Sequence, residues 1–179
     1  MTILITGFST RENASNASDV LVTSLRENLP DALAACANKL HFALIDADTY
    51  SLRATLENML QTVAPSACVF VGQAPGRNNI TLERVAGNLR FTGPPQAVGA
   101  APPSDHIDTA GPHERWATLP DMEMMIAQLH VADIPTAFSE NAGNIACATK
   151  SYMKACATRT KIRACRTVVL FTYPHCPSK

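Results

Sequence analysis

Residues 69–89 read VFVGQAPGRNNITLERVAGNL, and this stretch contains the features that decide the fold. The apolar run at residues 67–71 predicts a strand buried on both faces, because its hydrophobic character is continuous. A turn rich in glycine and polar residues follows, and a second strand-like segment then carries one acidic residue, Glu83. By residue type alone, these polar side chains fit an ordinary turn between strands as well as a functional site.

Strand and helix patterns alternate along the rest of the chain. The predicted strands are residues 2–6, where the run stops at Gly7, and residues 41–45, 67–71 and 134–138. The predicted helices are residues 16–29, 48–60 and 119–131, and residues 92–103 form a loop by composition. This alternation predicts an α/β fold with three layers, in which a mostly parallel twisted sheet carries helices on both faces.

The opening stretch resembles the glutamate active-site signature of the pyroglutamyl-peptidase I family. The order Gly–Gln–Ala–x–Gly–Arg, then Ile–Thr–x–Glu–Arg–x–Ala–x–Asn, runs from Gly72 to Asn88 without a gap. Thr6–Gly7–Phe8 resembles the start of the family pattern, and residues 134–147 resemble its approach to the nucleophile. The resemblance implies a cysteine exopeptidase that removes N-terminal pyroglutamate from peptides, with pyroglutamyl peptides as substrates and no cofactor or metal.

The resemblance also assigns roles to four residues. Cys147 corresponds to the nucleophile and Glu83 to the triad member that orients a histidine, while Phe8 and Gln73 correspond to the pyroglutamate pocket. A thiol near a helix N-terminus would gain thiolate character there. The structural alternatives are a small buried cysteine at position 147 and, for Glu83, an exposed charge paired with Arg84.

Several positions depart from the family pattern. Aligning the prolines near the end of the chain puts Thr172 where the catalytic histidine belongs, and threonine is no base at neutral pH. His175 is close in sequence, but its odd offset along a strand predicts the opposite face. Ala148 stands in place of the asparagine that follows the nucleophile, and Arg11 replaces a second pocket aromatic.

A shifted reading frame over residues 148–179 would explain both Ala148 and Thr172. Codons permitted for residues 171–177, read one base earlier, can spell Ile–His–Ile–Pro–Thr–Leu–Pro. Codons permitted for residues 148–157 can spell Asn–Gln–Val–Ile–Tyr–Glu–Gly–Leu–Arg in the same frame. The family shows such sequences around its histidine and after its nucleophile. Codons of the gene that are incompatible with these readings would refute the hypothesis.

Composition limits the remaining classes of function. The 179 residues fit a single domain over 1–179, and a net charge of zero without charge runs disfavours nucleic acid as a partner. The chain has no apolar stretch of bilayer length and no leader pattern, so we expect a cytoplasmic protein with no membrane partner and six free thiols. Cysteines 156, 165 and 176 match no paired metal-ligand spacing.

Three readings of function remain open from the sequence. The first is an active peptidase, and the second is a catalytically impaired relative that keeps the fold and binds pyroglutamyl peptides. The third is a general α/β binding or scaffold protein. The sequence also leaves open a homo-oligomer.

Overall fold

The computed structural model describes residues 2–9, 16–46, 52–74, 77–91, 104–106, 109–110, 113–116, 121–140 and 168–173. The helical elements are α1 (Ala17–Glu27), α2 (Asp31–Ala34), a 3-10 turn (Ala37–Lys39), α3 (Leu52–Val63) and α4 (Met122–Val131). The strands of the main sheet are β1 (Ile3–Ser9), β2 (Leu40–Asp46), β3 (Ala67–Gln73), β4 (Ile80–Glu83), β9 (Thr136–Ser139) and β10 (Val168–Tyr173). Two short antiparallel pairs join β5 (Val85–Gly87) to β8 (Glu114–Trp116) and β6 (Leu89–Phe91) to β7 (Ser104–His106).

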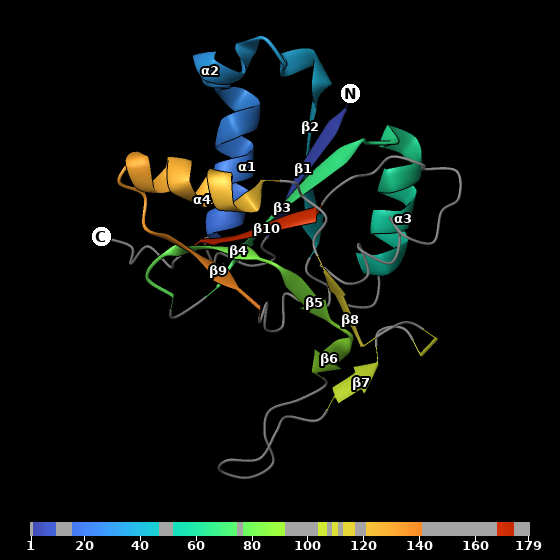
Figure 1. Ribbon diagram of the computed structural model, residues 1–179. Coiled ribbons are helices and arrows are strands. Elements are labelled where there is room, and N and C mark those ends of the chain that lie inside the picture. The colour runs from blue at the N-terminus through green and yellow to red at the C-terminus, as the bar shows by residue number, and fades with distance from the viewer. Residues whose placement is uncertain are drawn as a thin grey trace.

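The main sheet has six strands in the order β2-β1-β3-β10-β4-β9 (Figure 1). The strands β2, β1, β3 and β10 are mutually parallel, as the alternation of strands and helices predicts. The pair β10–β4 is antiparallel and β9 is parallel to β4, so the last two strands run in the opposite direction. The predicted α/β class with a mostly parallel sheet is therefore confirmed, and the reversal of β4 decides where its residues lie.

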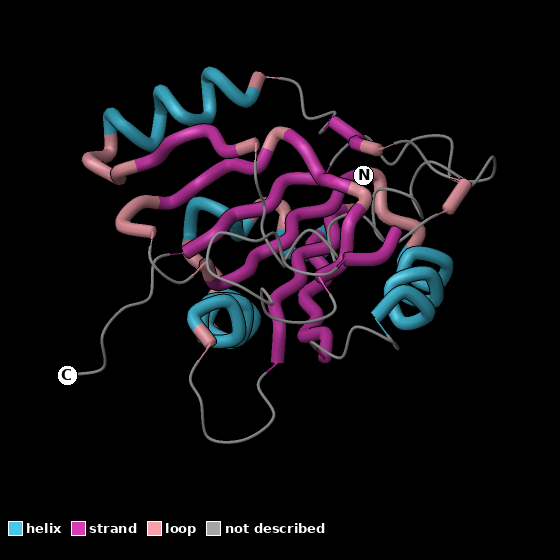
Figure 2. Tube along the Cα trace, turned by 90° about the horizontal axis from the view of Figure 1, so that it is seen from below, coloured by secondary structure: helices cyan, strands magenta, loops and turns pink. Residues whose placement is uncertain are grey.

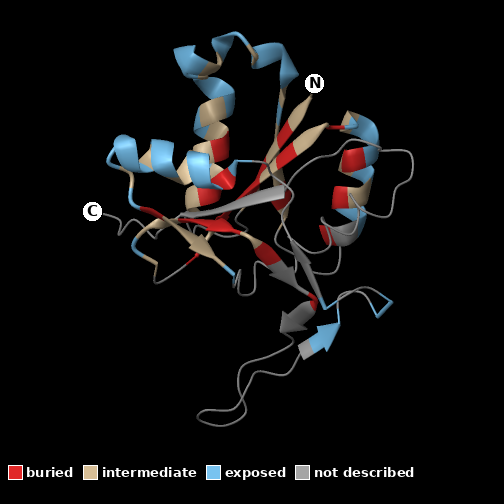
Figure 3. Ribbon diagram, in the orientation of Figure 1, coloured by how far each residue is buried: buried red, intermediate tan, exposed pale blue. Residues whose placement is uncertain are grey.

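Helices cover both sides of the sheet. α1 and α3 lie on opposite sides of the part formed by β1, β2 and β3 (Figures 1 and 2). α3 buries a leucine stripe of Leu52, Leu56 and Leu60, which matches the helical spacing in the sequence (Figure 3). α4 packs its apolar side chains, including Met122, against Leu82 of β4. No helix among the described residues has the length and apolar character that crossing a membrane requires.

The sequence offers Asn16 or Ser18 as the cap of the first helix, and the structure uses Asn16. Asn16 is the N-cap, and its side-chain oxygen accepts a hydrogen bond of 2.9 Å from the backbone N–H of Ser18. The Ser18 hydroxyl donates to the same oxygen over 2.7 Å and accepts the Phe8 backbone N–H over 3.0 Å. The first of these bonds satisfies an orphan N–H of the first helical turn, and the bond from Phe8 fixes α1 to the end of β1.

The predicted end of the first strand at Gly7 is wrong, because β1 continues to Ser9. Gly7 is needed for close packing rather than for a turn. A Cβ atom at position 7 would lie 2.5 Å from the Ser18 carbonyl oxygen and 3.0 Å from a methyl carbon of Val22. The backbone of α1 therefore approaches β1 more closely than a side chain at this position would permit.

Gly7→Ala is expected to destabilise the protein by about 1–3 kcal/mol, because the first turn of α1 would have to move away from the sheet. Thermal unfolding followed by circular dichroism measures the effect, which corresponds to a fall in Tm of roughly 2–12 °C. Ser24→Ala, on the exposed side of α1, is the control and should leave the Tm nearly unchanged. An unchanged Tm for Gly7→Ala would contradict the packing argument.

Candidate active site

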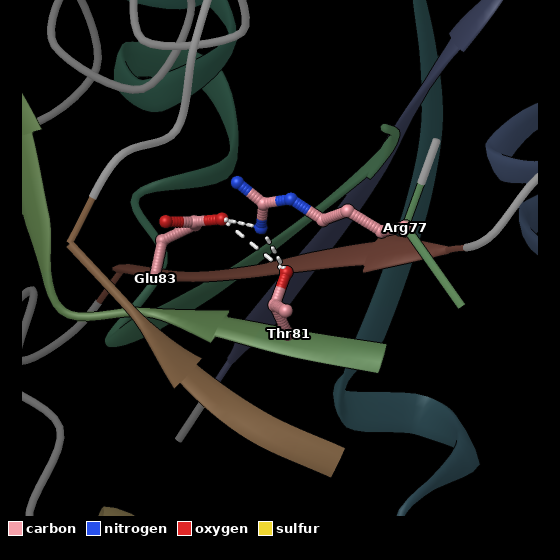
Figure 4. Close-up of polar contacts among 3 residues, drawn as sticks. All are labelled: Arg77, Thr81 and Glu83. Carbon is pink, nitrogen blue, oxygen red and sulfur yellow. Dashed lines mark hydrogen bonds and ion pairs between the residues drawn. The ribbon is translucent and has the colours of Figure 1, made fainter. Parts of the chain in front are cut away.

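Glu83 is a fully buried acidic residue at the end of β4, with 0% of its surface exposed. Its Oε1 atom forms an ion pair of 2.5 Å with Nη1 of Arg77, whose side chain is 26% exposed. The Thr81 hydroxyl donates a hydrogen bond to the same Oε1 atom over 3.3 Å. The Thr81 oxygen also accepts a hydrogen bond from Nη1 of Arg77 (Figure 4). Two side chains, those of Arg77 and Thr81, thus contact one oxygen of the Glu83 carboxylate.

The second oxygen of this carboxylate, Oε2, is buried and has no hydrogen-bond partner among the described residues. It points away from Arg77 and Thr81 (Figure 4). Buried polar atoms in native proteins almost always have a partner, because an unsatisfied one keeps its full desolvation cost. An oxygen in this state is the acceptor that a triad carboxylate would offer to an imidazole N–H.

Position 172 lies on the same face of the sheet as Glu83. In the β10–β4 pair the Cα of Thr172 is the register partner of Thr81, and directly opposed residues share a face. Glu83 follows Thr81 by two residues and so returns to that face. Diagonal neighbours across an antiparallel pair are about 7–8 Å apart, within reach of a long or ring-shaped side chain. The place that the proline alignment assigns to the base is therefore beside the Glu83 carboxylate.

The alternative in which Glu83 is an exposed charge paired with Arg84 is wrong. Arg84 projects to the other face of β4 and forms an ion pair of 2.5 Å with Glu140. Its guanidinium also lies 4.7 Å from the ring centroid of Phe138, and its backbone N–H donates to the Ser139 carbonyl over 2.8 Å. Period-two alternation along the strand separates these neighbouring charges, one buried and one at the surface.

Gln73 makes a contact that sequence reasoning did not anticipate. Its side-chain Oε1 accepts the Ala17 backbone N–H over 2.9 Å, so it caps the first turn of α1 from the end of β3. The proposed pocket residue Phe8 is half-buried at the end of β1. The hydroxyl of Ser18 joins the Phe8 backbone to the same helix N-terminus. The Gln73 side chain and the Phe8 backbone therefore both bind the start of α1.

The family resemblance leads us to expect Glu83 beside Cys147, Gln73 and Phe8 at one end of the sheet, because ligands of open parallel sheets bind beyond the carboxyl ends of the strands. The strand register differs from this expectation for Gln73. Because β4 runs against β3 and β10, the register places Thr81 level with Gly72, and Glu83 level with Phe70. Glu83 is therefore about three residues, or roughly 10 Å, inward from the row of Gln73, and the alternation of the strand puts the two on opposite faces.

Gln73→Leu is expected to destabilise the protein by about 0.5–2 kcal/mol, because the Ala17 N–H would lose its acceptor. Urea denaturation measures this change as a lower midpoint concentration of urea, while the dependence of the unfolding free energy on urea concentration stays the same. Gln73→Glu keeps the accepting oxygen and is the matched control, with a smaller expected loss. Equal losses for both variants would argue against the cap.

The other predicted site residues lie outside the described residues. These are Cys147, its neighbour Ala148, His175 and Arg11. Within the described ranges, no group of three or more His, Cys, Asp or Glu side chains could hold a metal ion. Sequence reasoning missed the contact of Arg77 with Glu83. The Gly–Arg pair of the signature could have indicated this contact, because it places the Arg77 guanidinium six residues before the Glu83 carboxylate.

Comparison with known proteins decides the family. A family model described as pyroglutamyl peptidase matches residues 1–178. The chain belongs to the pyroglutamyl peptidase family. It is 36% identical over 101 residues to a pyrrolidone-carboxylate peptidase of Thermococcus onnurineus, covering 56% of this chain and 50% of the relative. It is also 39% identical over 93 residues to the pyrrolidone-carboxylate peptidase of Bacillus subtilis. That match covers 52% of this chain and 43% of the relative.

The solved structure of Bacillus amyloliquefaciens pyroglutamyl peptidase I is similar with a TM-score of 0.80 and 26% sequence identity. The likeness covers 98% of this chain and 82% of that one. The matches to the curated relatives cover less of the sequence than the structural match does. The chain spans about half the length of the curated relatives it matches. The family membership and the fold are thereby established.

Proposed function

We propose that the protein carries the site of a cysteine exopeptidase that hydrolyses the bond after an N-terminal pyroglutamyl residue, and that Thr172 leaves this site without its base. The single observation that supports the proposal is the buried Glu83 carboxylate, with one oxygen anchored and the other unpartnered among the described residues. An orienting carboxylate in a catalytic triad has this arrangement.

The reaction would proceed by acyl transfer to the Cys147 sulfur. A thiolate attacks the carbonyl carbon after the pyroglutamyl ring, the C–N bond breaks, and the leaving amine takes a proton from the protonated base. Water then attacks the thioester carbonyl, gives its proton to the base, and releases free pyroglutamate and the thiol. Glu83 would accept the second N–H of the imidazole and so fix its tautomer and orientation.

Phe8 fits the substrate side of this proposal better than the Gln73 carboxamide does. Phe8 follows Thr6 by two residues, and Thr6 is the register partner of Phe70, which lies level with Glu83. Phe8 is therefore on the face of the sheet that carries Glu83, where an aromatic side chain suits a flat neutral lactam. A contact of Gln73 with substrate remains a prediction, and it would have to coexist with the bond to Ala17.

A second candidate function is binding of pyroglutamyl peptides without turnover. The observation that favours it is the register of Thr172, which occupies the position beside Glu83 with a residue that has no basic group. Both candidates predict that pyroglutamate analogues raise the Tm, because a ligand that binds only the folded state stabilises it by mass action. A general scaffold protein would show no such rise.

The experiment combines binding and turnover on the chain with Thr172. Thermal shift with pyroglutamate amide is expected to raise the Tm, whereas proline amide, which lacks the lactam carbonyl, should not. Release of aminomethylcoumarin from its pyroglutamyl amide then separates the peptidase from the binding protein. No response to the lactam in either assay would overturn both candidates.

A further inference from the structure

Two histidine rings meet at the short antiparallel pairs β5–β8 and β6–β7, which extend away from the main sheet (Figure 1). The ring centroids of His106 and His113 are 5.8 Å apart, and the ring planes are tilted by 53°. Both residues are exposed to solvent. Neither histidine takes part in the proposed reaction, so their meeting needs a separate explanation.

Backbone pairing holds the two histidines near each other. His106 is the register partner of Leu89 in the β6–β7 pair. The His113 carbonyl accepts a hydrogen bond of 2.7 Å from the backbone N–H of Asn88, a buried residue directly before Leu89. Two consecutive residues therefore anchor both histidine-bearing segments, so the rings meet because the backbone brings them together.

The separation of the rings is close to the one that two imidazoles on a single metal ion require. Metal–nitrogen bonds of about 2.1 Å put the ion about 3.2 Å from the centre of each ring. At bond angles of roughly 90–110°, the two ring centres are then about 4.5–5.3 Å apart. The centroids of His106 and His113 are only slightly farther apart than this. Exposed side chains change their torsion angles readily, so a small rotation closes the difference.

We propose that His106 and His113 bind a divalent transition-metal ion of the nickel, copper or zinc class. Imidazole is a ligand that suits all of these ions, whereas magnesium and calcium prefer oxygen. A histidine that binds a metal through one ring nitrogen commonly donates its other N–H to a protein oxygen, so neither ring has to lack a protein partner. Two protein ligands leave the remaining positions to water, and we expect weaker binding than in closed sites with four protein ligands. A bound ion would join β7 to the start of β8.

A tilted contact between two rings also occurs without a metal, because the edge of one aromatic ring attracts the face of another at this distance. Such a contact predicts that the chain binds a metal ion no better with both histidines than with one. Coordination predicts the opposite. Once one imidazole holds the ion, the second binds it intramolecularly, and the loss of either ring removes that gain in affinity. The dependence of metal affinity on both rings therefore separates the two explanations.

The experiment titrates the full chain with Ni²⁺ in a calorimeter at about pH 8, because imidazole binds metal ions in its neutral form. We expect His106→Ala and His113→Ala each to weaken nickel binding by about 10-fold or more. The matched control is His41→Ala, which removes an exposed histidine of β2 and should leave the affinity unchanged. Cys36→Ser removes a half-exposed thiol as an alternative ligand and should also have no effect. Mg²⁺ should produce no heat of binding.

Every outcome of this titration decides the proposal. Both histidines are exposed, so the alanine variants should keep the parent Tm without metal, which circular dichroism checks. Should one of them unfold, the glutamine variant at the same position makes the same test. The proposal is overturned by unchanged nickel affinity in either histidine variant, by equal weakening in His41→Ala, or by a parent chain that does not bind nickel. The titration does not use the proposed reaction, so a failure of pyroglutamyl turnover leaves its result intact.

Discussion

Replacing residues 148–179 with the sequence that the gene encodes in the shifted frame is expected to raise the rate of pyroglutamyl hydrolysis by about 10⁴-fold or more. The expected size follows from the cooperation of triad members. A nucleophile without its base loses most of its advantage, and the remaining members cannot act independently. The measurement is the steady-state rate of aminomethylcoumarin release by the two chains under identical conditions.

Two variants serve as controls for this comparison. In the restored chain, Cys147→Ala should abolish the gain, because the thiol is the nucleophile. In the original chain, Thr172→His is expected to recover less activity than the restored tail, since Ala148 and the residues after it are unchanged. A restored chain that is no faster than the original would contradict the reading-frame hypothesis and the assignment of position 172.

Arg77→Met is expected to destabilise the protein by about 3–5 kcal/mol, which is the typical cost of leaving a buried charge without its partner. Glu83 is fully buried and its Oε1 would keep only the Thr81 hydroxyl among the contacts described above. The loss is a large share of a usual net stability of about 5–15 kcal/mol. Thermal unfolding measures it, with an expected fall in Tm of roughly 10 °C or more.

The matched control is Glu140→Gln, which removes the ion pair between Glu140 and Arg84, the residue that follows Glu83. The side chains of Arg84 and Glu140 are 36% and 56% exposed, so solvent screens their attraction. The expected loss is about 0–1 kcal/mol, as for other surface pairs. Losses of equal size in Arg77→Met and Glu140→Gln would contradict the view that burial makes the Glu83 pair different.

Local patterns in the sequence predict the fold where burial is continuous. The apolar runs of β2 and β3 give these strands within one or two residues. The leucine stripe gives the buried face of α3, although the helix begins and ends three or four residues later than predicted. Asn16 or Ser18 predicts the start of α1, because a side-chain acceptor at that point satisfies the first helical N–H groups, and Asn16 is the residue that does so. Gly7 misled the prediction of β1, since glycine there admits a neighbouring helix and does not end the strand.

Long-range pairing accounts for what the sequence does not predict. β10 lies between β3 and β4 although it is far from both along the chain, and strand order depends on contacts of this kind. The reversal of β4 follows from the same pairing, and it moves Glu83 inward from the edge where Gln73 lies. The sequence signature identifies Glu83 as a site residue, but only the folded sheet brings Arg77, Thr81 and position 172 around it.

The central claim is that the site keeps its orienting carboxylate but lacks its base. The most direct test is the rate of pyroglutamyl aminomethylcoumarin hydrolysis by the chain with Thr172, measured beside its own Cys147→Ala variant. We expect both rates to be very low and similar, because the Cys147 thiol already lacks a base that would deprotonate it. A high rate with Thr172 that Cys147→Ala abolishes would contradict it, and would show that another histidine, such as His175, acts as the base.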